Sequence, residues 1–148
     1  MPNHDFTAEQ VRDFRALAGA IIPPSAVYGV PGADDERIFS DILKSLERDR
    51  DDIRQALAHL ARLAGGAFAD LDPARRAEVA AAFRETGGAP LAALVRVVLL
   101  CYYRDDRVMG SLGLEPRPPF PRGHVVEQGD WSLLDPVRKR VPMYRTVD

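Results

Sequence analysis

The sequence is poor in the side chains that perform most catalytic and metal chemistry. It has one cysteine, Cys101, so no disulfide can form within the chain. The three histidines, His4, His59 and His124, lie far apart, and none stands near another His or a Cys at metal-site spacing. The H-x-x-E pair of His124 and Glu127 lies in a segment without helical periodicity. We therefore expect neither a disulfide framework nor a bound metal.

The motifs of nucleotide-binding and nucleophilic sites are also absent. No G-x-G-x-x-G or G-x-x-x-x-G-K-[ST] segment occurs, so no loop is expected to cradle phosphates. No serine lies in a G-x-S-x-G turn. Cys101 lies late in an apolar segment, where a thiol is usually an inert hydrophobe. We expect no catalytic residue in this chain, and no flavin or nicotinamide bound to it.

No charge of one sign dominates, and no long apolar run is present. The 20 basic and 22 acidic residues give a net charge of −2, which points away from nucleic acid and anionic membranes. The longest apolar run, residues 97–101, is too short to span a bilayer. Residues 1–9 show no basic segment followed by an apolar run. We expect a soluble, cytoplasmic protein, with a periplasmic location through an export signal not present in this chain as the alternative.

What the sequence does contain is an arginine- and alanine-rich composition with helical periodicity. Arginine outnumbers lysine 18 to 2, and 46% of the 148 residues are hydrophobic, enough for the core of one domain. The pattern predicts an all-α fold, a small bundle of about five helices. They are expected at residues 7–21, 34–46, 53–64, 72–86 and 90–102.

The ends of these helices carry recognisable signals. Thr7 and Gln10 form a capping-box pattern, and Pro23-Pro24 stops the first helix. Gly65-Gly66 is suited to end the third helix in the left-handed conformation. The fifth helix is apolar on several faces, so we expect it in the middle of the bundle.

Two charged segments have a structural and a functional interpretation. The mixed run at residues 47–52 is typical of a solvated corner between the second and third helices. Asp105-Asp106, between Arg104 and Arg107, could be an acid–base or ion site. We favour a helix end with a local ion-paired turn.

The character of the chain changes at residue 113. The last 36 residues hold six of the twelve prolines and no sustained helical periodicity. We predict a helical bundle over residues 1–112 and a long, mostly irregular, Pro-rich C-terminal arm over residues 113–148. The arm is rich in apolar and aromatic side chains, which need burial on the chain's own helices or on another protein. The candidate partner-binding residues are Tyr103, Met109, Phe120, Arg122, Trp131, Leu133, Leu134 and Tyr144.

Two short segments of the arm suggest what kind of partner it binds. Residues 117–122, Arg-Pro-Pro-Phe-Pro-Arg, resemble polyproline ligands that bind proteins at low ordering cost. The basic residues 138–140 lie near Asp130 and Asp135, so they do not predict nucleic-acid binding.

Several segments, taken in order, resemble one family. Residues 101–109, Cys-Tyr-Tyr-Arg-Asp-Asp-Arg-Val-Met, are followed by Leu112-Gly113, by Arg-Pro-Pro-Phe-Pro-Arg-Gly at 117–123 and by Asp-Trp-Ser-Leu-Leu-Asp-Pro-Val at 130–137. An early Ile-Ile-Pro-Pro, residues 21–24, closes the first helix. This order resembles the gluconate 2-dehydrogenase subunit 3 family, the small subunits of bacterial glucose–methanol–choline (GMC)-type flavin dehydrogenases. The resemblance covers most of the chain and is most specific at residues 102–113 and in the Pro-rich tail.

The resemblance implies a partner rather than an activity. In that family the large subunit holds FAD and oxidises a sugar, sugar acid or glycoside. The small subunit binds the large one, supports its folding and often carries a twin-arginine export signal for the pair. This sequence shows no such leader, and no catalytic residue transfers to it.

We therefore favour a non-catalytic accessory subunit that binds and stabilises a large FAD-dependent dehydrogenase. The alternative is a self-contained helical interaction module or homo-oligomer, whose arm exchanges between copies. A third hypothesis is a free-standing helical enzyme with an unrecognised site. The sequence names neither the substrate, the electron acceptor nor the stoichiometry, nor does it place the arm at an active-site entrance.

Overall fold

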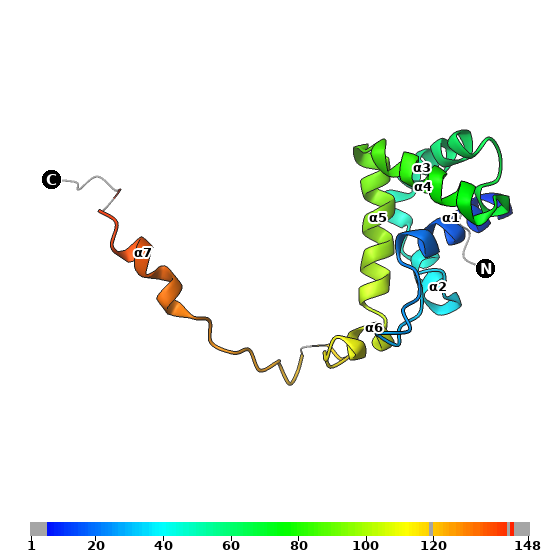
Figure 1. The fold of residues 1–148 in the computed structure, drawn as a ribbon. Helices are drawn as coiled ribbons and strands as arrows, with labels where there is room; N and C mark the ends of the chain where they lie inside the picture. Colours follow the sequence, from blue (N-terminus) through cyan, green and yellow to red (C-terminus); the bar gives the residue numbers. More distant parts are fainter. Residues whose placement is uncertain (1–5, 119, 142, 144–148) are drawn as a thin grey trace. The chain divides into compact units, whose positions relative to one another are not determined.

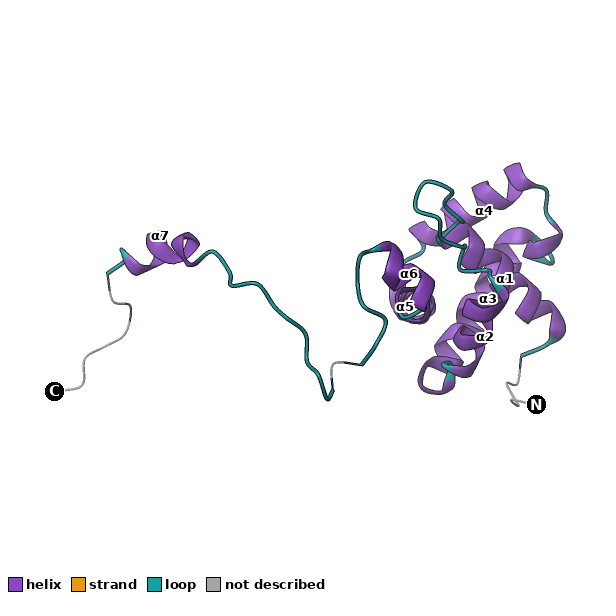
Figure 2. Cartoon of the chain, turned by 90° about the horizontal axis from the view of Figure 1, so that it is seen from below, coloured by secondary structure: helices purple, strands orange, loops and turns teal. Residues whose placement is uncertain are grey.

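The computed structural model describes residues 6–118, 120–141 and 143. It contains α-helices and short 3-10 turns but no β-strand in these ranges, which confirms the all-α prediction (Figures 1 and 2). The described residues form seven α-helices rather than the five predicted. The chain divides into two compact units, residues 1–116 and 117–148, which we call unit 1 and unit 2.

Unit 1 holds most of the regular structure. Its elements are α1 (Ala8–Ile21), α2 (Glu36–Lys44), η1 (Glu47–Asp49), α3 (Arg50–Ala64), η2 (Phe68–Asp70), α4 (Pro73–Glu85), α5 (Gly88–Tyr103) and α6 (Asp106–Ser111). Unit 2 contains η3 (Trp131–Leu134) and α7 (Asp135–Arg138). The additional helices are the short α6 and α7, of six and four residues.

The residues predicted to begin the first helix and to end the third do so in the structure. The backbone N–H of Gln10 donates to Thr7 Oγ1 at 3.1 Å, and the N–H of Thr7 donates to Gln10 Oε1 at 2.9 Å. This is a complete capping box at the start of α1. Gly65 ends α3 with φ of 71°, a left-handed conformation that glycine adopts without Cβ strain.

The core of unit 1 lies where α1, α2, α3 and α5 meet. Phe14 on α1 packs edge-on against Phe39 on α2, with ring centroids 5.6 Å apart. Asp13 is buried beside this core and accepts a 2.8 Å hydrogen bond from the backbone N–H of Ala69, which ties α1 to η2. The largest fully buried side chains are Phe14, Leu17, Ile38, Ile42, Leu46, Ile53, Leu60, Phe68, Leu94, Val98 and Cys101.

The fifth predicted helix does not lie in the middle of the bundle. α5 begins at Gly88 and packs on α3 and α2, at one side of unit 1 (Figures 1 and 2). Its Leu94 and Val98 are buried, whereas Leu99 and Leu100 are exposed. The prediction of a central position was wrong because a helix can carry apolar side chains on several faces without burying all of those faces inside its own fold.

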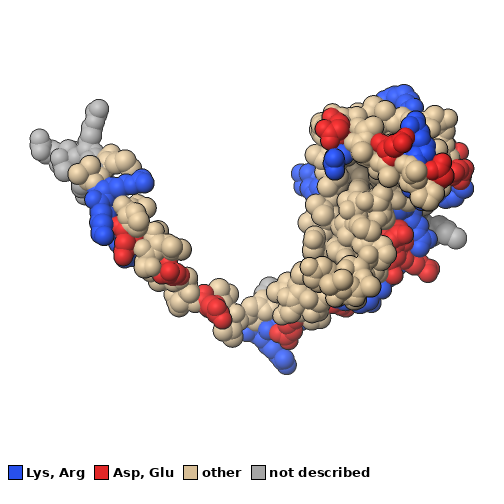
Figure 3. Space-filling model, viewed as in Figure 1, with Lys and Arg blue, Asp and Glu red and all other residues tan. Residues whose placement is uncertain are grey.

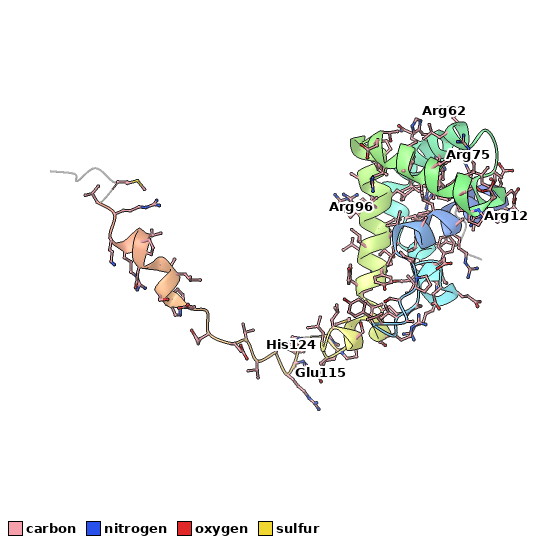
Figure 4. All side chains as sticks on the ribbon, in the orientation of Figure 1. Arg12, Arg62, Arg75, Arg96, Glu115 and His124 are labelled. Carbon is pink, nitrogen blue, oxygen red and sulfur yellow. The ribbon has the colours of Figure 1, made fainter. Side chains whose placement is uncertain are left out.

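The charge run at residues 47–52 is only partly the solvated corner that was predicted. Its first half forms η1, and its second half is the first turn of α3. The Asp49 side chain is largely buried and forms an ion pair with Arg96 of α5. Arg96 is labelled in Figure 4. The run therefore also holds α5 against the start of α3.

Candidate partner-binding surfaces

A cluster of charged side chains positions α6 at the end of α5. Asp35 is the N-cap of α2, and Asp105 is the N-cap of α6. Arg107 joins these two caps: it donates to Asp35 at 2.7 and 3.2 Å and to Asp105 at 2.9 and 3.1 Å. Arg37 adds a contact with Asp105 at 3.7 Å and an ion pair with Asp106 at 3.3 Å. We call these five residues the cap cluster.

The electrostatics of the cap cluster favour its charged form. The hydrogen bond from the Arg107 side chain is the main cause that lowers the pKa of both Asp35 and Asp105. The same two carboxylates raise the pKa of Arg107. The Asp105 side chain is only 4% exposed, so its charge depends on these partners. The cluster is a structural ion-pair network, more extensive than the local ion-paired turn predicted at Asp105-Asp106.

Of the predicted contact residues, Tyr103 and Met109 lie in unit 1. Tyr103, at the end of α5, is 54% exposed, and its ring meets that of Tyr102 edge-on at 5.2 Å. The Tyr102 hydroxyl donates to the carbonyl of Pro31 at 3.2 Å, which fixes Tyr102 on the core side. Met109, on α6, is half-buried. Tyr103 therefore presents a contact surface, and Met109 presents a smaller one.

Tyr103 belongs to an exposed apolar stripe that sequence reasoning missed. On one side of α5, the exposed Arg96 is followed at helical spacing by Leu99, Leu100 and Tyr103, and these three apolar side chains are exposed. We call them the α5 stripe. Figure 3 shows few charged side chains over the face of unit 1 formed by α5 and α6. An exposed apolar stripe of this kind is typical of an interaction surface.

Unit 2 holds most of the predicted contact residues. Phe120, Trp131, Leu133 and Leu134 are all exposed, with Trp131 at 61%. None of the described residues of unit 2 is buried, so this unit has no core of its own. Its large exposed apolar side chains are Phe120, Val125, Val126, Trp131, Leu133, Leu134, Val137, Val141 and Met143.

Local hydrogen bonds order the segment around Trp131. Asp130 caps η3, because its carboxylate accepts from the Ser132 N–H at 3.0 Å and from the Ser132 hydroxyl at 2.6 Å. These bonds lower the pKa of Asp130. The indole N–H of Trp131 donates to Gln128 Oε1 at 3.3 Å. Trp131, Leu133 and Leu134 therefore lie together on one short 3-10 turn that these bonds stabilise.

An arginine forms hydrogen bonds across the Pro-rich stretch that begins at residue 117. It is Arg117, not Arg122, the arginine that was predicted to bind a partner. Arg117 donates to the carbonyls of Pro118 at 3.3 Å and Gly123 at 2.8 Å, so it spans the segment. Arg122, the predicted contact residue, is exposed. Tyr144, also predicted, lies outside the described residues.

An apolar groove between α1, α4 and α5 is a further surface that the sequence did not predict. It has a volume of about 670 Å³. The lining residues are Leu17, Ala20, Ile21, Pro73, Arg76, Ala77, Ala80, Ala81, Phe83, Arg84, Leu91 and Val95. Alanines supply much of one wall, and alanine in an arginine- and alanine-rich helix gives no hint from sequence that it borders a groove.

The described residues include one cysteine, Cys101, and two histidines, His59 and His124. Cys101 is 1% exposed, and burial raises the pKa of its thiol, which disfavours the nucleophilic thiolate. His59 lies on α3, where its Nδ1 is 3.1 Å from Nη2 of Arg62. His124 lies in unit 2. Within the described ranges, no group of three or more His, Cys, Asp or Glu side chains is placed to hold a metal ion.

Over the described residues, no single helix is both long and apolar enough to cross a bilayer. The α4–α5 pair passes a length and composition test together, but it is bent by 118° at the break between the helices.

Comparison with known proteins does not extend this description. No family model, no curated protein and no solved structure matches the chain.

Proposed function

We propose that the chain is a non-catalytic accessory subunit that binds and stabilises a large FAD-dependent, GMC-type dehydrogenase acting on a sugar, sugar acid or glycoside. The supporting observation is the state of unit 2, which carries nine large exposed apolar side chains and buries none of its described residues. Apolar surface on this scale favours burial against another protein. The order of sequence motifs that resembles the gluconate 2-dehydrogenase subunit 3 family suggests which protein that is.

In this proposal residues 113–148 form a Pro-rich arm that packs on the large subunit. Trp131, Leu133 and Leu134 are the principal anchors, because aromatic and aliphatic side chains in a desolvated patch provide most binding energy. The short turn at η3 presents them already ordered, which lowers the entropy lost on binding. Tyr103 and the rest of the α5 stripe add apolar contact from unit 1.

The chemistry of the complex belongs to the large subunit in this proposal. That subunit holds FAD and oxidises the substrate, and the present chain contributes no reacting group. Its role is thermodynamic, because a partner that binds only the folded form of a protein stabilises that form by mass action. Loss of the small subunit should therefore lower the amount and the thermal stability of active dehydrogenase.

The proposal predicts that Trp131→Ala weakens the complex. The large subunit, purified without the small one, can be titrated by calorimetry with the wild-type chain and with each variant. We expect a loss of about 2 kcal/mol or more, since truncation of a central aromatic anchor has this effect. Val27→Ala is the control: Val27 is 89% exposed in unit 1 and belongs neither to the arm nor to the α5 stripe.

An unchanged affinity for Trp131→Ala would contradict the assignment of the arm as the main contact. A monodisperse homo-oligomer that binds no flavoprotein would favour the self-contained module instead. Light scattering on the isolated chain distinguishes these two outcomes.

A further inference from the structure

We propose that the groove between α1, α4 and α5 is a second docking surface, which receives an acidic amphipathic helix of the partner subunit. This inference rests on the proposed function, because it assigns a further part of the same partner's contact. The surface lies within unit 1 and differs from the arm in its chemistry.

The walls of the groove are suited to a helix. α4 buries only Val79 and Phe83 of its 13 residues. Ala77 and Ala81, one turn apart on the same side of α4, are exposed and line the groove. Because a methyl group is the smallest side chain with a Cβ, a second helix can approach this wall closely, as in a helix laid into a groove.

The opposite wall is apolar and mostly of larger side chains. α1 contributes Leu17 and Ile21, and α5 contributes Leu91 and Val95. Leu17 is buried, while the other three are half-buried, so part of their apolar surface is open to the groove. An occupant with an apolar face would cover this surface and gain about 25 cal/mol for each Å² removed from water.

The charge of the groove is of one sign. Arg76 and Arg84 are its only charged lining residues, and no acidic residue lines it. Both lie on α4, eight residues apart, which corresponds to about 12 Å along the helix axis. An occupant that complements the groove is therefore apolar in the middle and carries carboxylates about two helical turns apart.

Arg76 contributes its charge from a fixed position, and Arg84 has hydrogen-bond capacity left for a carboxylate. Arg76 is held in place because its Nη2 donates to the carbonyls of Ala69 at 2.7 Å and Leu71 at 2.9 Å. Its Nε is buried and has no hydrogen-bond acceptor among the described residues. Arg84 contacts only its exposed neighbour Glu85, at 3.4 Å, a pair of little energetic value.

The same charges argue against other occupants. In a two-fold dimer with groove against groove, the arginines of the two copies would meet with no acidic lining residue between them, which is unfavourable. A fatty acid has one carboxylate and would satisfy only one of two separated cations. A helix with two acidic positions satisfies both.

The test uses the full-length chain and a synthetic probe. The probe is a fluorescein-labelled amphipathic helical peptide with Ala and Leu on one face and two Glu residues two turns apart. We expect it to bind, as measured by fluorescence anisotropy. Ala81→Glu and Ala77→Glu should each weaken binding at least about ten-fold, because they add a buried like charge opposite the probe's Glu residues.

Matched controls separate the groove from general effects on α4. Ala82 is also exposed on α4 but does not line the groove, so Ala82→Glu should leave the probe's affinity within about two-fold. Arg84→Glu should weaken the Glu probe and strengthen a version with Lys in place of Glu. Circular dichroism of each variant confirms that the fold is retained.

The outcomes distinguish failure of this inference from failure of the proposed function. If Ala77→Glu, Ala81→Glu and Arg84→Glu all leave the affinity for the probe and for the large subunit unchanged, the groove is not a docking surface, although the arm can still bind. Self-association that Ala81→Glu abolishes would assign the groove to a second copy and overturn the inference. Trp131→Ala should leave the probe's affinity unchanged, because the inference assigns the probe to the groove of unit 1 and Trp131 belongs to unit 2.

Discussion

At the scale of single residues, Arg107 links two helix starts of the described chain. One guanidinium group contacts the N-cap carboxylates of two helices, α2 and α6, that begin about seventy residues apart in sequence. Each carboxylate already accepts from the first backbone N–H groups of its own helix. Arg107 thus couples two local capping interactions into one tertiary contact.

This coupling predicts how stability depends on pH. The pKa of Asp35 and of Asp105 is lowered in the folded state, mainly by the Arg107 hydrogen bond, so folding favours the ionised carboxylates. The two carboxylates contribute their full stabilisation above the pKa of an unfolded Asp side chain, near 3.8. This stabilisation is lost as the pH falls through the lower pKa that each has in the folded state. Urea unfolding from pH 7 down to pH 2 should therefore show stability falling below about pH 5.

Arg107→Met should reduce both the stability and its dependence on pH. We expect about 1–3 kcal/mol lower stability at pH 7, because Asp105 would lose its main partner while still largely buried. The acid-induced loss should also be smaller than in the wild type. Arg75→Met, which breaks the exposed pair with Glu78, is the control and should cost less than about 0.5 kcal/mol. Parallel pH curves for the wild type and Arg107→Met would be inconsistent with this role.

At the scale of elements, the sequence predicted helices better than it predicted their places. The capping box, Pro73 at the start of α4 and the left-handed Gly65 are local features, set by backbone chemistry within one turn. α6 was missed because six residues are too few for an apolar period. Asp105, the N-cap of α6, was interpreted from the sequence as part of the end of the preceding helix, not as the start of a new one.

The place of α5 illustrates what periodicity leaves open. An apolar side chain needs cover, but the sequence does not say whether its own fold or a partner supplies that cover. In α5 one face is buried in the core, and the α5 stripe is exposed. The apolar surplus that was interpreted as a central position therefore corresponds to an exposed face of α5.

The two faces of α5 should respond differently to the same substitution. Leu94→Ala should destabilise the isolated chain by about 2–5 kcal/mol, because Leu94 is fully buried and its loss leaves a cavity. Leu100→Ala should change stability by less than about 0.5 kcal/mol, because Leu100 is 60% exposed. Urea denaturation at neutral pH measures both. Similar losses at both positions would mean that the stripe is buried in solution.

At the scale of the whole molecule, the predicted candidates divide between the two units. Tyr103 and Met109 belong to unit 1, whereas Phe120, Arg122, Trp131, Leu133 and Leu134 belong to unit 2. The sequence singled out the candidate contact residues of unit 2 because aromatic and aliphatic side chains are conspicuous among prolines and glycines. It could not identify the groove or the α5 stripe, because both depend on which helix faces pack together.

The two units also differ in whether their described apolar side chains are buried. Unit 1 buries a contiguous core that includes Phe14, Ile53 and Val98. Unit 2 is ordered locally by hydrogen bonds around Asp130 and Arg117, but it buries no described residue. Contact with another surface would cover these apolar side chains, and the proposed function places that surface on a large flavoprotein subunit.

The most direct test is to purify the tagged chain from its native host and measure the mass and absorbance of what elutes. The account predicts one complex, much heavier than the 16.3 kDa chain, that contains a second, larger polypeptide and has the yellow absorbance of a bound flavin. A stable 16.3 kDa monomer that carries no second polypeptide and no flavin would contradict it.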